Sequence, residues 1–307
     1  MKTYARRTLG LILAGLILTG ATGCDRTEKS GAAASAPAVA ARADGAERYA
    51  LTGEVLSVNE AGKAITVRHD EVKGLMPAMT MDFAVSGGDV RVLKAGQHIR
   101  AELVREKNGD SRLEKIWPDD QATNAAIAAG ARGLREDTMT KGKAAYRDVG
   151  EAIPNFTLLD QEGRVITSGR FRGKTVMLNF IFTRCPFVDK CPAATLKMMA
   201  AQKQVKAAAL PNIELISITL DPAYDTPGIL KEYAAARGID PANFSFLTGP
   251  EGAIRDLLTQ FGVVAEFEGD LLKHSLATLL IDPTGKIIHR ADGSGWEPEE
   301  FVAKMKK

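Results

Sequence analysis

The stretch "TVMLNFIFTRCPFVDKCPAATLKMM" (residues 175–199) decides how the second half of this chain folds. Residues 175–183 form an almost continuous apolar run, which is typical of a strand buried on both faces of a sheet. Residues 192–209 follow with apolar side chains at helical spacing. Cys185 and Cys191 lie between the two, with Cys191 at the start of the helix. The stretch therefore predicts a buried strand, a turn that carries thiols, and a helix.

The segments that follow repeat this alternation. Residues 213–220 form a second apolar run, and residues 225–238 and 251–262 have helical spacing and stop at glycine. Residues 275–293 predict a hairpin turned by "DPTG", and residues 297–307 predict a last helix. Strands that alternate with helices and finish in a hairpin plus a helix predict a thioredoxin-like α/β domain over residues 146–307.

The cysteine pair allows three interpretations: a structural disulfide, a redox catalyst or a soft-metal site. A helix N-terminus stabilises a thiolate and makes it reactive. The five residues between Cys185 and Cys191 exceed the two of the usual thioredoxin spacing, so the sulfurs have more freedom to open around an ion. His274 precedes a predicted strand, where thioredoxins commonly have a proline. Two thiolates and one imidazole make a good copper site.

Upstream, residues 48–118 have a different pattern. Five short segments mix β-branched and apolar residues with polar ones and are divided by turn residues. They predict a small all-β, five-stranded barrel of the oligonucleotide/oligosaccharide-binding type, which closes its own edges. The segments are residues 49–59, 64–72, 79–85, 98–106 and 112–118.

Soft donors gather in this predicted barrel. Met79 and Met81 are two apart and face the same way on a strand, Met76 precedes Pro77, and His69 lies on the preceding strand. Thioethers with an imidazole suit cuprous ion, and unlike thiols they form no disulfides. The alternative is packing of the methionines in the barrel core.

The N-terminus predicts export. A basic start and a short apolar run indicate a signal peptide over residues 1–23, and the run is too short for a permanent membrane helix. "ATGC" resembles the lipobox of bacterial lipoproteins, which implies acylation of Cys24, and Asp25 resembles the signal for retention at the inner membrane. An ordinary signal peptide cut elsewhere and twin-arginine export through Arg6 and Arg7 are the alternatives.

Two weakly patterned segments separate these parts. Residues 24–47 are rich in alanine and cannot build a core, so we expect a flexible tether. Residues 119–145 would allow a short helix but have little to bury, and we expect a linker. The formal net charge of +2 and the absence of a basic run give no reason to expect nucleic acid.

Residues 146–307 resemble the Sco/SenC family of copper-binding, thioredoxin-like assembly factors for cytochrome oxidase. The resemblance rests on "FTRCPFVDKCP", "ISITLDPAYDTPGILKEYA", "FSFLTG" and "LLKHSLATLLIDPTGKII". It implies that Cys185, Cys191 and His274 bind copper, although this chain has two more residues between its cysteines than the family's three. Asp221 and Asp225 match the acidic segment of the family, and we expect Asp225 to cap a helix.

Residues 48–118 resemble the CusF-like periplasmic copper-binding domain, a small five-stranded barrel. In that family a histidine and two methionines bind the metal and a tryptophan covers it. The resemblance implies that His69, Met79 and Met81 are ligands, and it places Met76 at the position of the tryptophan, where it offers an additional sulfur.

Together these features predict a copper chaperone, lipid-anchored on the periplasmic side of the bacterial inner membrane. It would carry Cu(I), or Cu(II), to an apo-cuproprotein such as a cytochrome c oxidase subunit during assembly of its copper centre. A thiol–disulfide oxidoreductase is the enzymatic alternative: Cys185 attacks, Cys191 resolves the mixed disulfide, and a periplasmic thiol reductant restores the pair. Copper buffering for metal resistance is the third hypothesis.

Overall fold

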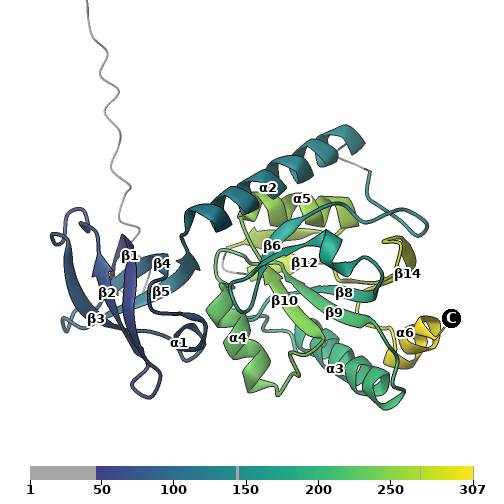
Figure 1. The fold of residues 1–307 in the computed structure, drawn as a ribbon. Coiled ribbons are helices and arrows are strands. Elements are labelled where there is room, and N and C mark those ends of the chain that lie inside the picture. The colour runs from purple at the N-terminus through teal and green to yellow at the C-terminus, as the bar shows by residue number, and fades with distance from the viewer. Residues whose placement is uncertain (1–45, 143–144, 270, 307) are drawn as a thin grey trace, which may run out of the picture. The chain divides into compact units, whose positions relative to one another are not determined.

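The computed structural model describes residues 46–142, 145–269 and 271–306. The predictions for the signal peptide, for acylation at Cys24 and for most of the tether concern residues outside these ranges. The described residues form a β-barrel, a long helix and an α/β domain (Figure 1). None of the described helices is both long enough and apolar enough to span a membrane.

The barrel has five strands, as the sequence predicted. Their pairing order is β1-β2-β3-β5-β4, and β4 returns to pair with β1. The ring is closed between β3 and β5 by one residue pair, Ala84 with Arg112. The strands are β1 (Glu47–Asn59), β2 (Ala64–His69), β3 (Met79–Ala84), β4 (His98–Arg105) and β5 (Ser111–Pro118), with the one-turn helix α1 (Asp89–Val92) between β3 and β4.

Alternating side chains fill the barrel. On β2, Ile65 and Val67 point inward while Arg68 is exposed, which is the period-two pattern of a strand with one buried face. Phe83 on β3 is the largest fully buried side chain of this barrel. The buried apolar side chains of the barrel form one continuous hydrophobic cluster, which is separate from the core of the α/β domain.

The second domain contains a seven-stranded sheet in the order β14-β13-β8-β9-β10-β6-β7. The central strands β8, β9 and β10 run parallel, and β13 and β14 form the antiparallel hairpin expected from "DPTG". This is a thioredoxin-like topology. The strands are β6 (Thr157–Asp160), β7 (Val165–Thr167), β8 (Thr175–Ile181), β9 (Ile213–Thr219), β10 (Phe244–Thr248), β13 (Ala277–Ile281) and β14 (Ile287–Asp292).

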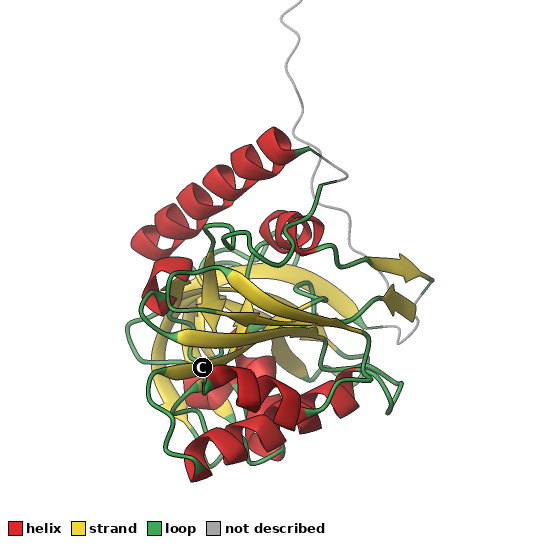
Figure 2. Cartoon of the chain, turned by 90° about the vertical axis from the view of Figure 1, so that its right-hand side faces the viewer, coloured by secondary structure: helices red, strands yellow, loops and turns green. Residues whose placement is uncertain are grey.

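Helices cover both faces of this sheet (Figure 2). Helix α3 (Cys191–Ala207) contacts α6 (Pro298–Met305) below the sheet in Figure 1, and α5 (Glu251–Phe261) lies above it. Helix α4 (Pro227–Ala236) packs on β10. Helix α5 ends at Gly262, whose φ of +63° is the left-handed conformation that glycine adopts without steric penalty. These helices confirm the predicted ones.

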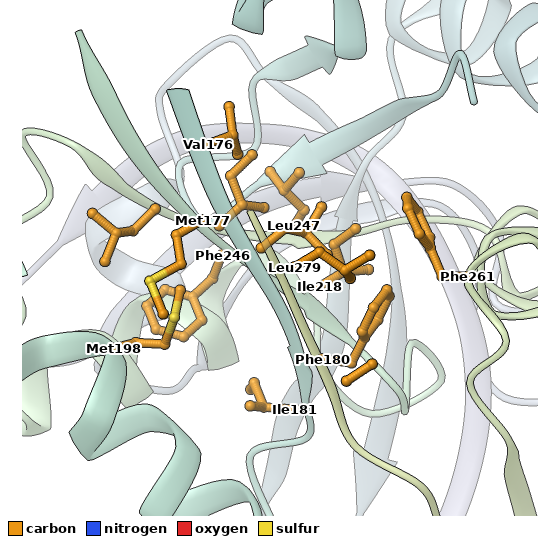
Figure 3. Close-up of a cluster of buried hydrophobic side chains, with 14 of the residues drawn as sticks. Val176, Met177, Phe180, Ile181, Met198, Ile218, Phe246, Leu247, Phe261 and Leu279 are labelled. Atoms are coloured by element: carbon orange, nitrogen blue, oxygen red, sulfur yellow. The ribbon is translucent and has the colours of Figure 1, made fainter. Parts of the chain in front are cut away.

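The core of the α/β domain lies between these layers (Figure 3). Phe180 on β8 packs against Phe261 at the end of α5, with ring centroids 5.6 Å apart. Met177 and Met198 meet on the other face of the sheet, so Met198 fills the core as expected for a helical methionine. Burial on both faces explains why β8 is almost entirely apolar.

Residues 121–141 differ from the short helix that we expected. They form α2 (Gln121–Lys141), 21 residues long, begun by the Asp120 side chain, which accepts a hydrogen bond from Thr123 N–H. Leu134 is buried in the core of the α/β domain, and α2 contacts α5. This segment therefore has more to bury than its alanine-rich sequence indicated.

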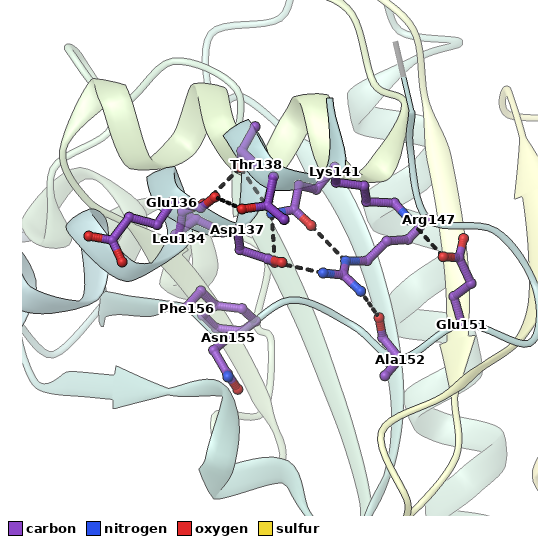
Figure 4. Close-up of polar contacts among 12 residues, drawn as sticks. Leu134, Glu136, Asp137, Thr138, Lys141, Arg147, Glu151, Ala152, Asn155 and Phe156 are labelled. Atoms are coloured by element: carbon purple, nitrogen blue, oxygen red, sulfur yellow. Dashed lines mark hydrogen bonds and ion pairs between the residues drawn. The ribbon is translucent and has the colours of Figure 1, made fainter. Parts of the chain in front are cut away.

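Polar contacts hold the end of α2 (Figure 4). The Arg147 guanidinium donates to Asp137 of α2 at 2.6 Å, to Gln260 of α5 at 2.6 Å and to the carbonyl of Ala152 at 2.8 Å. One side chain thus connects α2, α5 and the segment that enters the α/β domain.

A small ribbon of two antiparallel strands forms a separate sheet. It comprises β11 (Ala265–Glu268) and β12 (Leu271–His274), which our sequence analysis did not predict. Leu272 is its one buried residue, while Phe267 is 53% exposed. The ribbon matters because its last residue is His274.

Candidate metal centre

The structure brings together the three residues predicted to form a metal site in the second domain. Cys185 lies in the turn after β8, Cys191 is the first residue of α3, and His274 ends β12. One ligand atom from each lies within 4.8 Å of the other two. Both cysteines are free thiols rather than a disulfide.

The distances suit a shared ion. The Nε2 atom of His274 lies 3.6 Å from Cys191 Sγ and 3.9 Å from Cys185 Sγ. Sulfur and imidazole ligands lie about 2.0–2.3 Å from a first-row metal, so two such ligands at a trigonal angle are about 3.7 Å apart. Both nitrogen–sulfur distances are therefore close to the spacing that one soft ion requires.

Neighbouring groups orient the imidazole. Its Nδ1 atom lies 3.2 Å from the carbonyl oxygen of Ser275, and Phe182 packs edge-on against its ring at a centroid distance of 5.3 Å. Donation from Nδ1 to this carbonyl leaves the Nε2 lone pair directed at the sulfurs. Desolvation by burial lowers the pKa of His274, and the charge of Lys190 lowers it further. The neutral, metal-binding form of the imidazole is thus favoured.

The two thiols have different environments. Cys191 is 1% exposed, whereas Cys185 is half-buried. Burial raises the pKa of the Cys191 thiol, and the neighbouring Cys185 raises it further. Desolvation by burial thus opposes the stabilised, reactive thiolate that we expected at the helix N-terminus. A bound cation would have to displace this proton.

The expected role of Asp225 was wrong. The N-cap of α4 is Thr226, whose hydroxyl accepts from Ile229 N–H at 3.5 Å. Asp225 instead accepts hydrogen bonds from Thr183 N–H at 3.1 Å, from the Thr183 hydroxyl and from the Thr219 hydroxyl at 2.6 Å. Asp225 is fully buried, and its hydrogen bonds to Thr183 hold the start of the cysteine turn.

Sequence reasoning missed Arg184. Its Nε donates to the buried carboxylate of Asp221 at 2.7 Å, and its guanidinium lies over the ring of Tyr224 at 4.6 Å from the centroid. The charged residue directly before Cys185 was the one available indication, because its partners are distant in sequence.

The barrel places its predicted donors on neighbouring strands. His69, the last residue of β2, pairs across the sheet with Met79, and Val67 pairs with Met81. Met79 and Met81 share the face of β3 that carries the buried Phe83. The structure therefore places the His69 and Met79 backbones opposite each other and directs Met81 to the same side.

His69 has an orphaned nitrogen. The residue is 2% exposed, its Nδ1 lies 2.7 Å from the carbonyl oxygen of Asp70, and its Nε2 is buried without a hydrogen-bond partner. Buried polar atoms are rarely left unpaired, so this nitrogen is available to bind a ligand.

The three methionines of this cluster differ in exposure. Met76 and Met81 pack partly against the barrel core, while Met79 is 47% exposed. Val72 and Met76 form an isolated antiparallel bridge that folds the loop between β2 and β3 back on itself. Since Met79 is not packed inside, core packing does not explain its presence on this strand.

Comparison with known families agrees with this geometry. Residues 144–307 match the model of the SCO1/SenC family, which is more than half of the chain. The chain belongs to the SCO1/SenC family. An SCO2-like protein of Rickettsia typhi is 36% identical over 169 residues, covering 51% of this chain and 79% of that protein. A SCO1 protein homolog of Bacillus subtilis is 32% identical over 159 residues, covering 50% of this chain and 81% of that protein.

A solved structure of a SCO1/SenC family lipoprotein from Bacillus anthracis is 26% identical with a TM-score of 0.47, and the match covers 53% of this chain and 98% of that one. Residues 48–118 match the family model described as copper binding periplasmic protein CusF. The SCO1/SenC member thus carries an additional, CusF-type domain. The prediction of copper is supported by these two matches and by the Cys–Cys–His group.

Proposed function

We propose that this protein is a membrane-tethered periplasmic copper chaperone that delivers copper to a cuproenzyme, the copper centre of cytochrome c oxidase in particular. The observation that carries the proposal is the convergence of Cys185, Cys191 and His274 on one point from three separate elements. Membership of the SCO1/SenC family supports the choice of recipient. The proposed anchor is a lipid on Cys24.

The barrel contributes a second copper site in this proposal. His69, Met79 and Met81 are its ligands, with Met76 as a further sulfur donor. The unpaired Nε2 of His69 and the exposed thioether-bearing Met79 support it. Methionine and histidine donors hold cuprous ion without the risk of disulfide formation, which suits capture in an oxidising compartment. Two sites on one chain raise the effective concentration of donor at acceptor.

A copper titration tests the two sites. The reduced full chain, titrated with cuprous ion against a competing chelator, should bind two equivalents tightly. Cys185→Ser and His274→Ala should each weaken one of them, and the double variant Met79→Leu/Met81→Leu should weaken the other. His98→Ala and Met139→Leu are matched controls, because both residues are exposed and belong to neither group. Two unchanged equivalents in every variant would refute the proposal.

A thiol–disulfide oxidoreductase is the second candidate, and the unequal exposure of the thiols favours it. The half-buried Cys185 thiolate would attack a substrate disulfide and release one substrate thiol. Buried Cys191 would then displace the second substrate thiol, leaving a Cys185–Cys191 disulfide. Single turnover with a disulfide substrate separates the candidates. His274→Ala should leave the rate of disulfide reduction unchanged while it weakens copper binding. An equal loss of reduction rate and copper affinity in this variant would contradict the view that the two activities are separable.

A further inference from the structure

The ribbon of β11 and β12 carries His274 and contacts the core through Leu272, the partly buried Ala265 and the His274 ring, which packs on Phe182. Among its described residues Leu272 alone is buried, and three of the four residues of β11 are exposed. At its base, Ser275 N–H donates to the carbonyl of Val264, and Val264 N–H donates to the Ser275 hydroxyl, each at 2.9 Å. A further contact is needed to hold the ribbon at the position where the His274 imidazole lies close to both cysteine sulfurs.

Arg184 is placed to do this. Its guanidinium lies 5.9 Å from the ring centroid of the exposed Phe267. It also lies 4.6 Å from the ring centroid of Tyr224. Phe267 pairs across the ribbon with Leu272, two residues before His274. The same Arg184 is covalently joined to Cys185. One side chain therefore touches the histidine-bearing ribbon while its backbone leads into the cysteine turn.

The guanidinium is itself held in place. Its Nε donates a hydrogen bond to the side chain of Asp221, which is 1% exposed. Asp221 lies two residues after the end of β9. A buried carboxylate on the rigid end of the sheet fixes one edge of the planar cation and leaves its face for the two rings. Thr183, one residue earlier, is held by Asp225. The cysteine turn is thus tied to the sheet at two successive residues.

We propose that Arg184 is a positioning residue that holds the β11–β12 ribbon against the cysteine turn and so sets the distance of His274 from Cys185 and Cys191. The inference rests on the proposed copper site but concerns a residue outside its ligand set. Arg184 touches no metal in this arrangement; it acts through Phe267 on one side and Asp221 on the other. Removing either its charge or the Phe267 ring should release the same ribbon.

Amide hydrogen exchange on the metal-free, reduced full chain tests the mechanical part. Arg184→Gln and Phe267→Ala should each accelerate exchange in β11 and β12, and the double variant should do so no more than either single one. Arg100→Gln is the matched control, because the exposed Arg100 makes a comparable contact with Trp117, at 5.2 Å, on strand β4 of the barrel. Unchanged exchange in Arg184→Gln would overturn the proposal, whatever the protein does with copper.

A double-mutant cycle with His274 tests the consequence for binding. In a chain whose barrel site is removed by Met79→Leu/Met81→Leu, Arg184→Gln should lower the cuprous affinity about 2- to 5-fold, the effect of a cation–π contact at an exposed site. In the His274→Ala background the same change should alter affinity less than about 2-fold, because the coupling between the two residues is gone.

Two results of these binding experiments are decisive, and a measurement of thermal unfolding is their control. An equal loss in both backgrounds would show that Arg184 supports the fold or the thiols and would overturn the inference. Thermal unfolding distinguishes this from general destabilisation, because Phe267→Ala keeps the Arg184–Asp221 ion pair and removes an exposed ring, so it should leave the midpoint near that of the parent. Absence of copper binding by the parent site would refute the proposed function instead, while the exchange experiment would still decide the role of Arg184.

Discussion

The substitution Asp225→Asn offers a sharp test of how the cysteine turn is held. Burial raises the pKa of this carboxyl from its ordinary value of 3.8 to about 6, against the opposing effect of hydrogen bonds from Thr183 and Thr219. Since the folded pKa is the higher one, folding favours the protonated form. The stability that this group contributes is complete below about pH 4 and falls as the pH rises through 6. A difference of about two pKa units corresponds to about 3 kcal/mol.

Asparagine should relieve that penalty without breaking the contacts. Its amide oxygen can accept from Thr183 N–H and the Thr219 hydroxyl, and its NH₂ can donate to the Thr183 hydroxyl, which reverses its role. We expect the variant to match the parent near pH 4 and to be more stable by about 2–3 kcal/mol at pH 8.

Urea denaturation of the metal-free, reduced protein at pH values from 4 to 8 measures this difference. Asp225→Ala serves as the comparison. It leaves buried donors unpaired at about 1–3 kcal/mol each and should be less stable at every pH. If Asp225→Asn were less stable than the parent at pH 8, the ionised carboxylate would be a net stabiliser of this turn and the reasoning would fail.

Further predictions concern the core, the redox state and the imidazole. Phe180→Ala should lower the free energy of unfolding by about 3–5 kcal/mol in urea titrations, because the ring is fully buried, while copper stoichiometry under native conditions stays at the parent value. Oxidation of Cys185 and Cys191 to a disulfide should abolish one cuprous equivalent and spare the other, as metal analysis after dialysis would show. Lys190→Gln removes a charge that lowers the pKa of His274, so an NMR titration should show this pKa move upward toward its ordinary value.

Much of the second domain could be predicted because its central strands are unusual. Residues of β8 and β9 are buried on both faces, so their sequences are mostly apolar, interrupted by a few polar residues such as Asn179 and Ser217. The short strands β6, β7, β11 and β12 have no such pattern. The sequence of β11, "AEFE", looks like exposed loop, because the ribbon has one anchoring side chain and solvent on most of its surface.

The site was only partly predictable for a related reason. Ligand types such as Cys, His and Met can be recognised individually, and their neighbours along the chain suggest strands or turns. The contact of Asp225 with Thr183 spans 42 residues and that of Arg184 with Asp221 spans 37, so no local pattern indicates them. Helix α2 was underestimated similarly: its alanines gave no sign that Leu134 would enter the core of the α/β domain.

The way the barrel closes has a consequence for the strand that bears its sulfurs. Strand β3 is paired with β2 at six positions, but a lone Ala84–Arg112 pair forms the seam on its other side. Met79 lies at the opposite end of the strand from that pair. This end therefore has a single hydrogen-bonded neighbour strand to separate from when it opens locally. In the proposed barrel site, such opening would admit a soft cation between the imidazole and the thioether.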